Sequence, residues 1–434
     1  MTSLSNSLIN IANQTQKRRQ IERKIDGIIV LHAERALRNF DESFIISLAR
    51  SSGVDFVQCL TDRAHTVAKN LEKLCGLLCV DNVELFPRFH ELVKKDFERS
   101  SPKLDNIEIE ITDSMKELQR ILLDLLSKSI TEVRKSGVDM GKYSVESLIT
   151  WHGLQRWIDQ DVQPVWDILS GSCKQAVNDI KELKQLLYAL NYTNAVYFHF
   201  LLEARKKEHI EKHELGWMEW ESSSSLFSLA KSRVYGPKGE LEIEIPPKWE
   251  AFTTMFNQLQ KTRTNKSVLI TCKTFKSAQL IFSLLKKSPA EVILNEYKRL
   301  VLNAEVLETN DFNESQPLAK VGDVYVLVLQ SAQYGLDTIL SDIEPEMIIV
   351  YDINLEAIRQ IENYKARRPA KPCHAVVLTY AQSVEEQQYL TVLNREIKSF
   401  ETLVAEKNEL IKRPDLKTGV PDSEKVLVGK FHSV

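Results

Sequence analysis

Beyond residue 247 the chain alternates between short apolar runs and longer amphipathic segments, and this alternation constrains the fold more than any other feature. Strands are expected at 267–272, 324–330, 347–352 and 374–380, and helices at 248–262, 275–287, 355–367 and 383–408. The strand segments are continuous and rich in β-branched residues, which is typical of strands buried on both faces of a parallel sheet. We therefore expect an α/β domain with a parallel sheet over 221–412.

The first hundred residues show the same pattern on a smaller scale. Strands are expected at 25–32 and 54–62, and helices at 40–53 and 65–78. Two strands are too few for a whole doubly wound sheet. Residues 1–100 are therefore expected to form the C-terminal part of an incomplete first lobe.

Between these regions the hydrophobic period changes from strand-like to helical. The segment "SSPKLD" marks a boundary, and after a short alternating "NIEIEI" we expect helices at 113–137, 144–171 and 174–208, with Thr112 and Ser144 as N-caps. Residues 101–220 are thus expected to be an all-helical domain. Residues 413–434 are polar and turn-rich, and we expect a flexible tail there.

Bulk properties exclude several classes of protein. The net charge is −3, so any binding to nucleic acid must use local patches rather than a global field. No apolar run approaches the ~20 residues that span a bilayer, so no membrane partner is expected. Cys75 and Cys79 lie one helical turn apart, but no second Cys/His pair completes a four-ligand zinc site.

Four separated segments carry a family resemblance. They are "LFPRFHELV", "PPKWEAF", "VYDINLEAIRQIENYKARRPAKP" and "SVEEQQYLTVLNREIKSFETLVAEK". In this order they resemble the helicase-like half of the XPF family, the large subunits of structure-specific DNA-repair endonucleases. The resemblance runs from about Ile25 to Lys407. It implies degenerate helicase-like (RecA-like) lobes flanking the helical domain, followed in the family by a nuclease domain and helix-hairpin-helix motifs that this chain lacks.

The groups that a nucleotide-driven motor needs are missing from the sequence. A phosphate-binding loop requires G-x-x-x-x-G-K-[ST], but in "MGKYS" Tyr143 stands in the hydroxyl position and the first glycine is absent. Where a motor ends a strand with D-E-x-H, this chain has Leu31, His32, Ala33 and Glu34. Glu34 alone could be a weak metal ligand, but we interpret it as a solvated residue at a helix start. An active helicase is therefore disfavoured.

No hydrolytic centre is expected on this chain. The family's nuclease signature is E-R-K-x-x-x-D, and "IERKIDG" starts like it at Glu22 but places Ile28 where the aspartate is required. His209 and His213 are spaced as a zinc pair on a helix but lack a third ligand, so a charged, solvent-facing helix end is expected. We assign no catalytic residue, metal ligand or cofactor here; the resemblance implies Mg²⁺ only for the absent nuclease domain.

Two groups of cations are candidates for contact with DNA phosphates. The first is Lys365, Arg367, Arg368 and Lys371, at the end of a helix and in the turn that follows; the second is Lys273 with Lys276, at the start of another helix. Such residues would contact the backbone without reading sequence. The alternative is that they complement the negative end of a helix or cap the surface.

The resemblance implies a nuclear DNA-repair protein that acts in nucleotide excision and crosslink repair. On this interpretation the chain is the ATPase-inactive module that binds branched or damaged DNA, a smaller non-catalytic heterodimer subunit and a repair scaffold protein. The alternative is a truncated, nuclease-free paralogue that is a scaffold in repair or meiotic recombination complexes.

Overall fold

The structure is a computed structural model. It describes residues 26–51, 53–78, 80, 82–100, 104–138, 140, 143–150, 153–262, 267–303, 318–329, 336–368, 373–412 and 427–428. In that part of the chain, none of the helices combines the length and apolar character needed to cross a bilayer. The chain divides into two compact units, Met1–Arg99 with Leu393–Val434, and Ser100–Val392. The division after Arg99 falls at the boundary that "SSPKLD" indicates, but the helical region and the second sheet lie in one unit.

The smaller unit contains a four-stranded sheet with the order β1-β2-β10-β3. Its strands, which pair in parallel, are β1 (Gly27–Leu31), β2 (Phe56–Leu60), β3 (Asn82–Val83) and β10 (Leu427–Val428). Its helices are η1 (Ala33–Leu37), α2 (Phe40–Ser51), α3 (Ala64–Val67), α4 (Leu71–Leu78) and α5 (Glu91–Ser100). Phe400 and Leu403, from the C-terminal part of α17 (Val384–Lys412), pack into the same core as Val57 and Leu74.

Two expectations for this unit need correction. The helix expected at 65–78 is broken between α3 and α4, where Lys69 takes a φ of 69° that a continuous helix does not allow. The tail expected at 413–434 contributes β10, in which Leu427 pairs with Asn82 and Val428 with Cys59. Leu427 and Val428 therefore belong to the sheet, where β10 pairs with both β2 and β3. Residues 413–426 and 429–434 lie outside the described residues.

The larger unit contains a six-stranded sheet with the order β4-β9-β8-β5-β7-β6. Its strands are β4 (Leu104–Glu110), β5 (Val268–Cys272), β6 (Leu318–Val321), β7 (Val324–Val328), β8 (Met347–Val350) and β9 (His374–Ala381). All neighbours are parallel except β6 with β7, which form an antiparallel pair at one edge. The predicted parallel sheet is confirmed.

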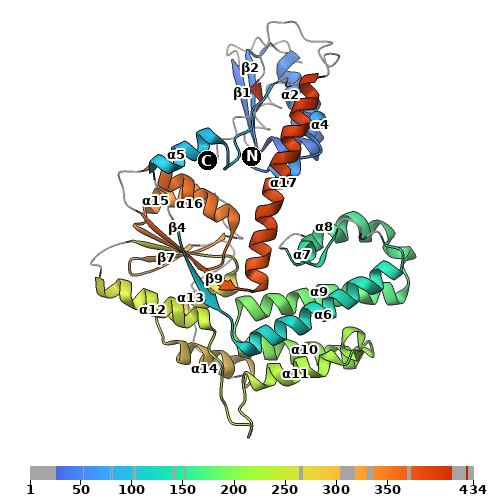
Figure 1. The fold of residues 1–434 in the computed structure, drawn as a ribbon, viewed down its shortest axis with the longest axis vertical. Coiled ribbons are helices and arrows are strands. Elements are labelled where there is room, and N and C mark those ends of the chain that lie inside the picture. Colours follow the sequence, from blue (N-terminus) through green and yellow to red (C-terminus); the bar gives the residue numbers. More distant parts are fainter. Residues whose placement is uncertain are drawn as a thin grey trace, which may run out of the picture. The chain divides into compact units, whose positions relative to one another are not determined.

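Helices cover both faces of this sheet (Figure 1). They are α12 (Pro247–Thr262), α13 (Phe275–Leu284) and α14 (Pro289–Leu300) on one face, and α15 (Leu336–Ile343) and α16 (Leu355–Arg367) on the other. Alternate strand residues serve the two cores: Ile270 and Ile349 face the first, and Leu269 and Ile348 the second. The period of two along a strand thus explains why the strand segments are apolar throughout.

Strand β4 corrects the expected domain boundary. Its sequence "LDNIEIE" lies in the region assigned to the helical domain, yet it pairs along its whole length with β9. As an edge strand β4 has few covering neighbours, and this explains its alternating polar and apolar residues. The helical region is therefore an insertion between the first and second strands of the sheet in chain order.

The insertion consists of four longer helices and several short segments. They are α6 (Asp113–Lys135), α7 (Val145–Ile149), α8 (Gly153–Trp157), η2 (Ile158–Val162), η3 (Gln163–Ile168), α9 (Gly171–Tyr192), α10 (Ala195–Lys212), η4 (Gly216–Glu219) and α11 (Ser222–Ser232). In Figure 1, α6 lies beside α9 and α11. Because α11 packs on α6 and α10, it belongs with the helical region, although its residues fall in the range 221–412 expected for the second lobe.

The two helices expected at 144–171 and 174–208 are each interrupted. Thr150 takes an extended ψ of 159° after α7, and Pro164 stands at the start of η3. Asn194 ends the second at its midpoint, because its side chain accepts a hydrogen bond from Tyr197 N at 2.9 Å and begins α10. The hydrophobic periodicity of the sequence does not reveal an N-cap that lies inside an apolar run.

Candidate nucleic-acid interface

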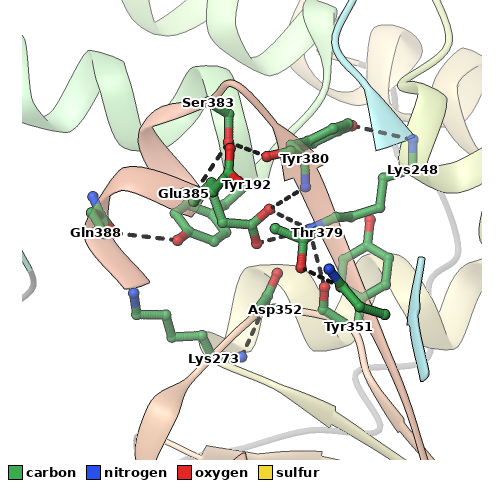
Figure 2. Close-up of polar contacts among 12 residues, drawn as sticks. Tyr192, Lys248, Lys273, Tyr351, Asp352, Thr379, Tyr380, Ser383, Glu385 and Gln388 are labelled. Carbon is green, nitrogen blue, oxygen red and sulfur yellow. Dashed lines mark hydrogen bonds and ion pairs between the residues drawn. The ribbon is translucent and has the colours of Figure 1, made fainter. Parts of the chain in front are cut away.

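Three neighbouring strands of the six-stranded sheet end at one edge. Thr271 of β5 pairs with Val350 of β8, and Val350 pairs with Val377 of β9. Because carboxyl ends of parallel strands meet at the same edge, the residues just beyond them gather there, and this is where open α/β sheets bind ligands. Lys273 and Asp352 lie at this edge (Figure 2). We call the group of side chains at this edge, which includes Lys273 and Asp352, the sheet-end cluster.

A buried ion pair forms the centre of the sheet-end cluster. Lys248, at the start of α12, places Nζ 2.7 and 2.8 Å from the two carboxylate oxygens of Glu385 in α17, and both side chains are almost fully buried. Lys248 Nζ also donates to the carbonyl oxygen of Tyr351 at 3.1 Å and lies over the ring of Tyr380, 4.8 Å from its centroid. Glu385 in turn accepts from Tyr380 N at 3.1 Å (Figure 2). Both charged side chains, Lys248 and Glu385, thus have ion-pair and hydrogen-bond partners within the protein.

Asp352 lies beside this pair and is fully buried. Its Oδ2 accepts from the backbone N–H of Lys273 at 2.8 Å. Among the described residues, none provides a hydrogen bond to Asp352 Oδ1. Burial raises the pKa of Asp352, although the positive charge of Lys248 opposes the shift. The carboxylate therefore holds the start of the loop after β5.

Lys273, a candidate for phosphate contact, directs its ammonium into the protein. Nζ lies 3.4 Å from the hydroxyl oxygen of Tyr188 and 5.2 Å from the ring centroid of Tyr192, both on α9. Burial lowers the pKa of Lys273, and the charge of Asp352 opposes the shift. The two tyrosines thus provide an aromatic environment for the cation.

Lys276, its partner in the second candidate group, forms an ion pair on the first turn of α13. Its Nζ lies 2.5 Å from Glu296 Oε1 on α14 and 4.9 Å from the ring centroid of Tyr197. Glu296 is buried and also accepts from Arg299. The structure brings Lys273 and Lys276 together at one helix start, as expected, but their charged groups are bound within the protein.

The first candidate group lies at the C-terminal end of α16 and is more accessible. Arg367 is 48% exposed, and its Nη1 lies 3.3 Å from Asp337 Oδ2. Arg368 Nη1 lies 2.6 Å from Glu344 Oε1, and its guanidinium lies over the ring of Tyr364. These pairs tie the end of α16 to α15 and to the turn that follows it.

Lys365 and Lys371 complete that group in the sequence. Lys365 is half-buried at the end of α16, and burial lowers its pKa. Lys371 lies outside the described residues. The accessible charge that the structure places at this helix end is therefore mainly that of Arg367.

Sequence reasoning missed the two central residues of the sheet-end cluster. Lys248 lies in "PPKWEAF" and Glu385 in "SVEEQQYL", two of the segments that carry the family resemblance, and they are 137 residues apart. The available signal was a lysine on an otherwise apolar helix face. Its partner could not be assigned, because an ion pair between distant helices leaves no spacing in the sequence.

The histidine pair expected at a solvent-facing helix end is arranged differently. His209 is buried; its Nε2 lies 2.7 Å from Glu182 Oε2, and its Nδ1 bonds the carbonyl oxygen of Glu214. Hydrogen bonds to both ring nitrogens raise the pKa of His209 despite the opposing effect of burial, which is the largest single influence. A ring with both nitrogens engaged has no lone pair left for zinc, and His213 caps the helix in the left-handed region.

Glu34 also departs from the expectation. It was interpreted as a solvated residue, but it is only 4% exposed and accepts a 2.6 Å hydrogen bond from Thr61 Oγ1. The end of β2 covers it, because β1 and β2 are adjacent and in register. Residues 22–25 of the nuclease-like segment lie outside the described residues, and Ile28, at the position where the signature requires an aspartate, lies in β1.

Known proteins resemble this chain in sequence. No protein-family model matches it. DNA repair endonuclease XPF of Cricetulus griseus is 26% identical over 514 residues, covering 89% of this chain and 56% of that protein. The XPF of Drosophila melanogaster is 22% identical over 500 residues, with 89% and 52% covered. DNA repair protein RAD1 of Saccharomyces cerevisiae is 26% identical over 299 residues, which cover 63% of this chain and 27% of that protein.

The chain is similar in sequence to XPF-type DNA-repair proteins over 89% of its length. The XPF resemblance expected from the four sequence segments is thereby confirmed. This chain spans about half the length of the XPF proteins it matches.

The fold has a solved counterpart. The helicase domain of Pyrococcus furiosus Hef is 14% identical, with a TM-score of 0.58 over 88% of this chain and 77% of that structure. The likeness confirms a helicase-like fold in which α/β lobes accompany a helical region. The sheet-end cluster is therefore part of a helicase-like lobe.

Proposed function

We propose that this chain is the helicase-like module of an XPF-type DNA-repair protein, which binds branched DNA and partner proteins without hydrolysing a nucleotide. The sequence relatives named as DNA-repair endonucleases and the helicase-like fold support this proposal. The nucleus is the compartment in which such a module would work. A smaller heterodimer subunit and a repair scaffold protein are the partners that the resemblance implies.

The sheet-end cluster is the main support for the proposal that this chain does not hydrolyse a nucleotide. A lobe that grips a triphosphate needs cations and donors at the ends of its strands that are available to phosphate oxygens. Here Lys248 is paired with Glu385, and Lys276 is paired with Glu296, which also binds Arg299. The chain also has no G-x-x-x-x-G-K-[ST] segment. The groups that would hold a nucleotide stabilise the lobe instead.

The end of α16 is the place where this lobe can contact a DNA backbone. Exposed ion pairs such as Arg367 with Asp337 contribute only about 0–1 kcal/mol, so a phosphate can replace the carboxylate at little cost. Guanidinium groups bind phosphate oxygens through two parallel hydrogen bonds. With a net charge of −3, the chain depends on such local positive groups.

Equilibrium binding of the purified chain to three labelled DNAs tests the proposal. A fork with a single-strand/double-strand junction, a bubble and a plain duplex of equal length are compared at one salt concentration. We expect the fork and bubble to bind at least about tenfold more tightly than the duplex, because phosphate contact alone is sequence-independent and the preference must come from strand geometry. Equal affinity for all three DNAs would contradict recognition of branched DNA.

A further inference from the structure

The ends of β1 and β2 bring three ligand-type side chains together in the smaller unit. Leu31 pairs with Leu60, so His32 and Asp62 follow the two adjacent strands at the same edge. The ligand atoms of His32, Glu34 and Asp62 all lie within 4.8 Å of one another. His32 Nδ1 is 3.6 Å from Asp62 Oδ1 and 4.0 Å from Glu34 Oε1.

Glu34 is the residue that makes this arrangement more than a surface cluster. Its side chain is 4% exposed, and its Oε2 is bound by the hydroxyl of Thr61. Within the described ranges, no donor makes a hydrogen bond to Glu34 Oε1, which is buried and lies on the side of His32. An unsatisfied buried carboxylate oxygen is costly, and a cation placed between it and its neighbours would remove that cost.

We propose that His32, Glu34 and Asp62 bind a divalent transition-metal ion of the zinc type. One imidazole nitrogen and two carboxylate oxygens suit Zn²⁺ better than Mg²⁺, which prefers oxygen ligands throughout. His32 and Asp62 are 43% and 52% exposed, so an ion can enter from solvent and water can complete its coordination. The ion would connect the ends of the two strands. This site does not depend on the proposed DNA binding. It also differs from the magnesium site of a nucleotide-driven motor, because Leu31 stands where such a motor has its aspartate.

Arg63 is the group that competes with the ion. Its Nε lies 3.8 Å from Glu34 Oε1, and its side chain is 53% exposed. Hydrogen bonding does not hold it to Glu34 at that distance. Bound metal would displace the guanidinium into solvent, and without metal the guanidinium partly balances the buried carboxylate.

Zinc affinity of the full chain, measured by competition with a chromophoric chelator, tests this site. The variants are His32→Asn, chosen because asparagine tolerates the φ of 55° at this position, and Asp62→Asn on the exposed side. We expect one Zn²⁺ bound by the wild type and an affinity about 10- to 100-fold weaker in either variant, since loss of even a supporting group has effects of that size. Arg63→Gln should bind Zn²⁺ more tightly than the wild type.

His374→Asn is the matched control. His374 Nε2 lies 3.4 Å from Asp105 Oδ2 at a similar exposure, but the described residues offer this pair no third ligand. Its zinc affinity should equal that of the wild type. Added Zn²⁺ should also raise the melting temperature of the wild type and the control but not of His32→Asn. Equal zinc affinity in the wild type, His32→Asn and Asp62→Asn would overturn the proposal, because the ion would then be bound elsewhere.

Discussion

At the scale of single residues, Lys248 shows how groups of the protein itself hold the strand ends of the helicase-like lobe. Its ammonium satisfies Glu385 and the carbonyl oxygen of Tyr351, and it contacts the rings of Tyr351 and Tyr380. Removing only one partner of such a fully hydrogen-bonded buried pair strongly destabilises a protein.

A double-mutant cycle on this pair is the first prediction. Lys248→Met should lower the free energy of unfolding by about 3–5 kcal/mol, because Glu385 keeps a buried charge without a partner. Glu385→Gln should have a cost of the same kind. The double variant should lose clearly less than the two single losses added together, as urea unfolding would show. Simple additivity of the losses would mean that the two charges do not interact.

Asp179 provides a pH-dependent prediction. It is buried on α9 among Gln175, Glu182, His209 and the backbone N–H of Trp217, and burial raises its pKa to about 6. A carboxyl with a raised pKa contributes stability that is complete below its ordinary pKa of 3.8 and is lost as the pH rises through about 6. The charged form is therefore a cost at neutral pH.

Asp179→Asn should remove that cost. We expect the variant to exceed the wild type by about 1–2 kcal/mol in unfolding free energy at pH 8 and to match it near pH 4. Asp159→Asn is the matched control, because Asp159 accepts from Gln155 four residues earlier, as Asp179 does from Gln175, but is exposed. A benefit that does not change with pH would rule out titration of Asp179 as its cause.

The location of candidate residues could be predicted from the sequence, but their partners could not. Lys273 and Lys276 lie at the start of a helix, as expected. Their ammonium groups contact Tyr188 and Tyr197, which precede them by more than seventy residues and lie on other helices. The direction of a long side chain depends on neighbours that are distant in the sequence. The hydrophobic periodicity of the sequence therefore does not predict this direction.

At the scale of elements, the central strands of the six-stranded sheet were predicted better than helix ends, whereas β3, β6 and β10 were not predicted. β5, β8 and β9 match their expected positions because a buried β-branched run has few alternatives. The long helices were predicted in type, but the interruptions at Lys69, Thr150 and Asn194 were not. β4 was placed in the wrong domain because strand pairing across a long insertion has no local signal.

The end of α16 carries the prediction at this scale. Arg367→Ala with Arg368→Ala should weaken fork binding and reduce the slope of log affinity against log salt by about 1–2, because roughly 0.9 of a counterion is released per phosphate contact. Asp337→Asn should strengthen binding, since it frees Arg367. The slopes are measured by titration at several salt concentrations.

Arg120→Ala with Lys135→Ala is the control for that experiment. Both residues are exposed cations on α6 that pair with a carboxylate on their own helix, at 2.5 and 2.6 Å. This variant has the same change in net charge and should keep the wild-type slope. If both double variants changed the slope equally, the effect would come from total charge, and the end of α16 would be only a capped helix terminus.

At the scale of the whole molecule, the helicase-like lobe uses lysines near the ends of its strands for contacts within the same chain. The six-stranded sheet is covered by helices on both faces, as in other α/β lobes. Lys248 and Lys276, near the carboxyl ends of its strands, are paired with Glu385 and Glu296. The DNA binding that we propose would therefore use other surfaces, such as the end of α16.

Steady-state ATP hydrolysis in the presence of fork DNA and Mg²⁺ tests this claim most directly. We predict that the purified chain hydrolyses ATP no faster than buffer, with or without the fork, because among the described residues Lys248 and Lys276 are paired with carboxylates of the protein. DNA-stimulated hydrolysis that co-purifies with the chain through successive columns would contradict the account.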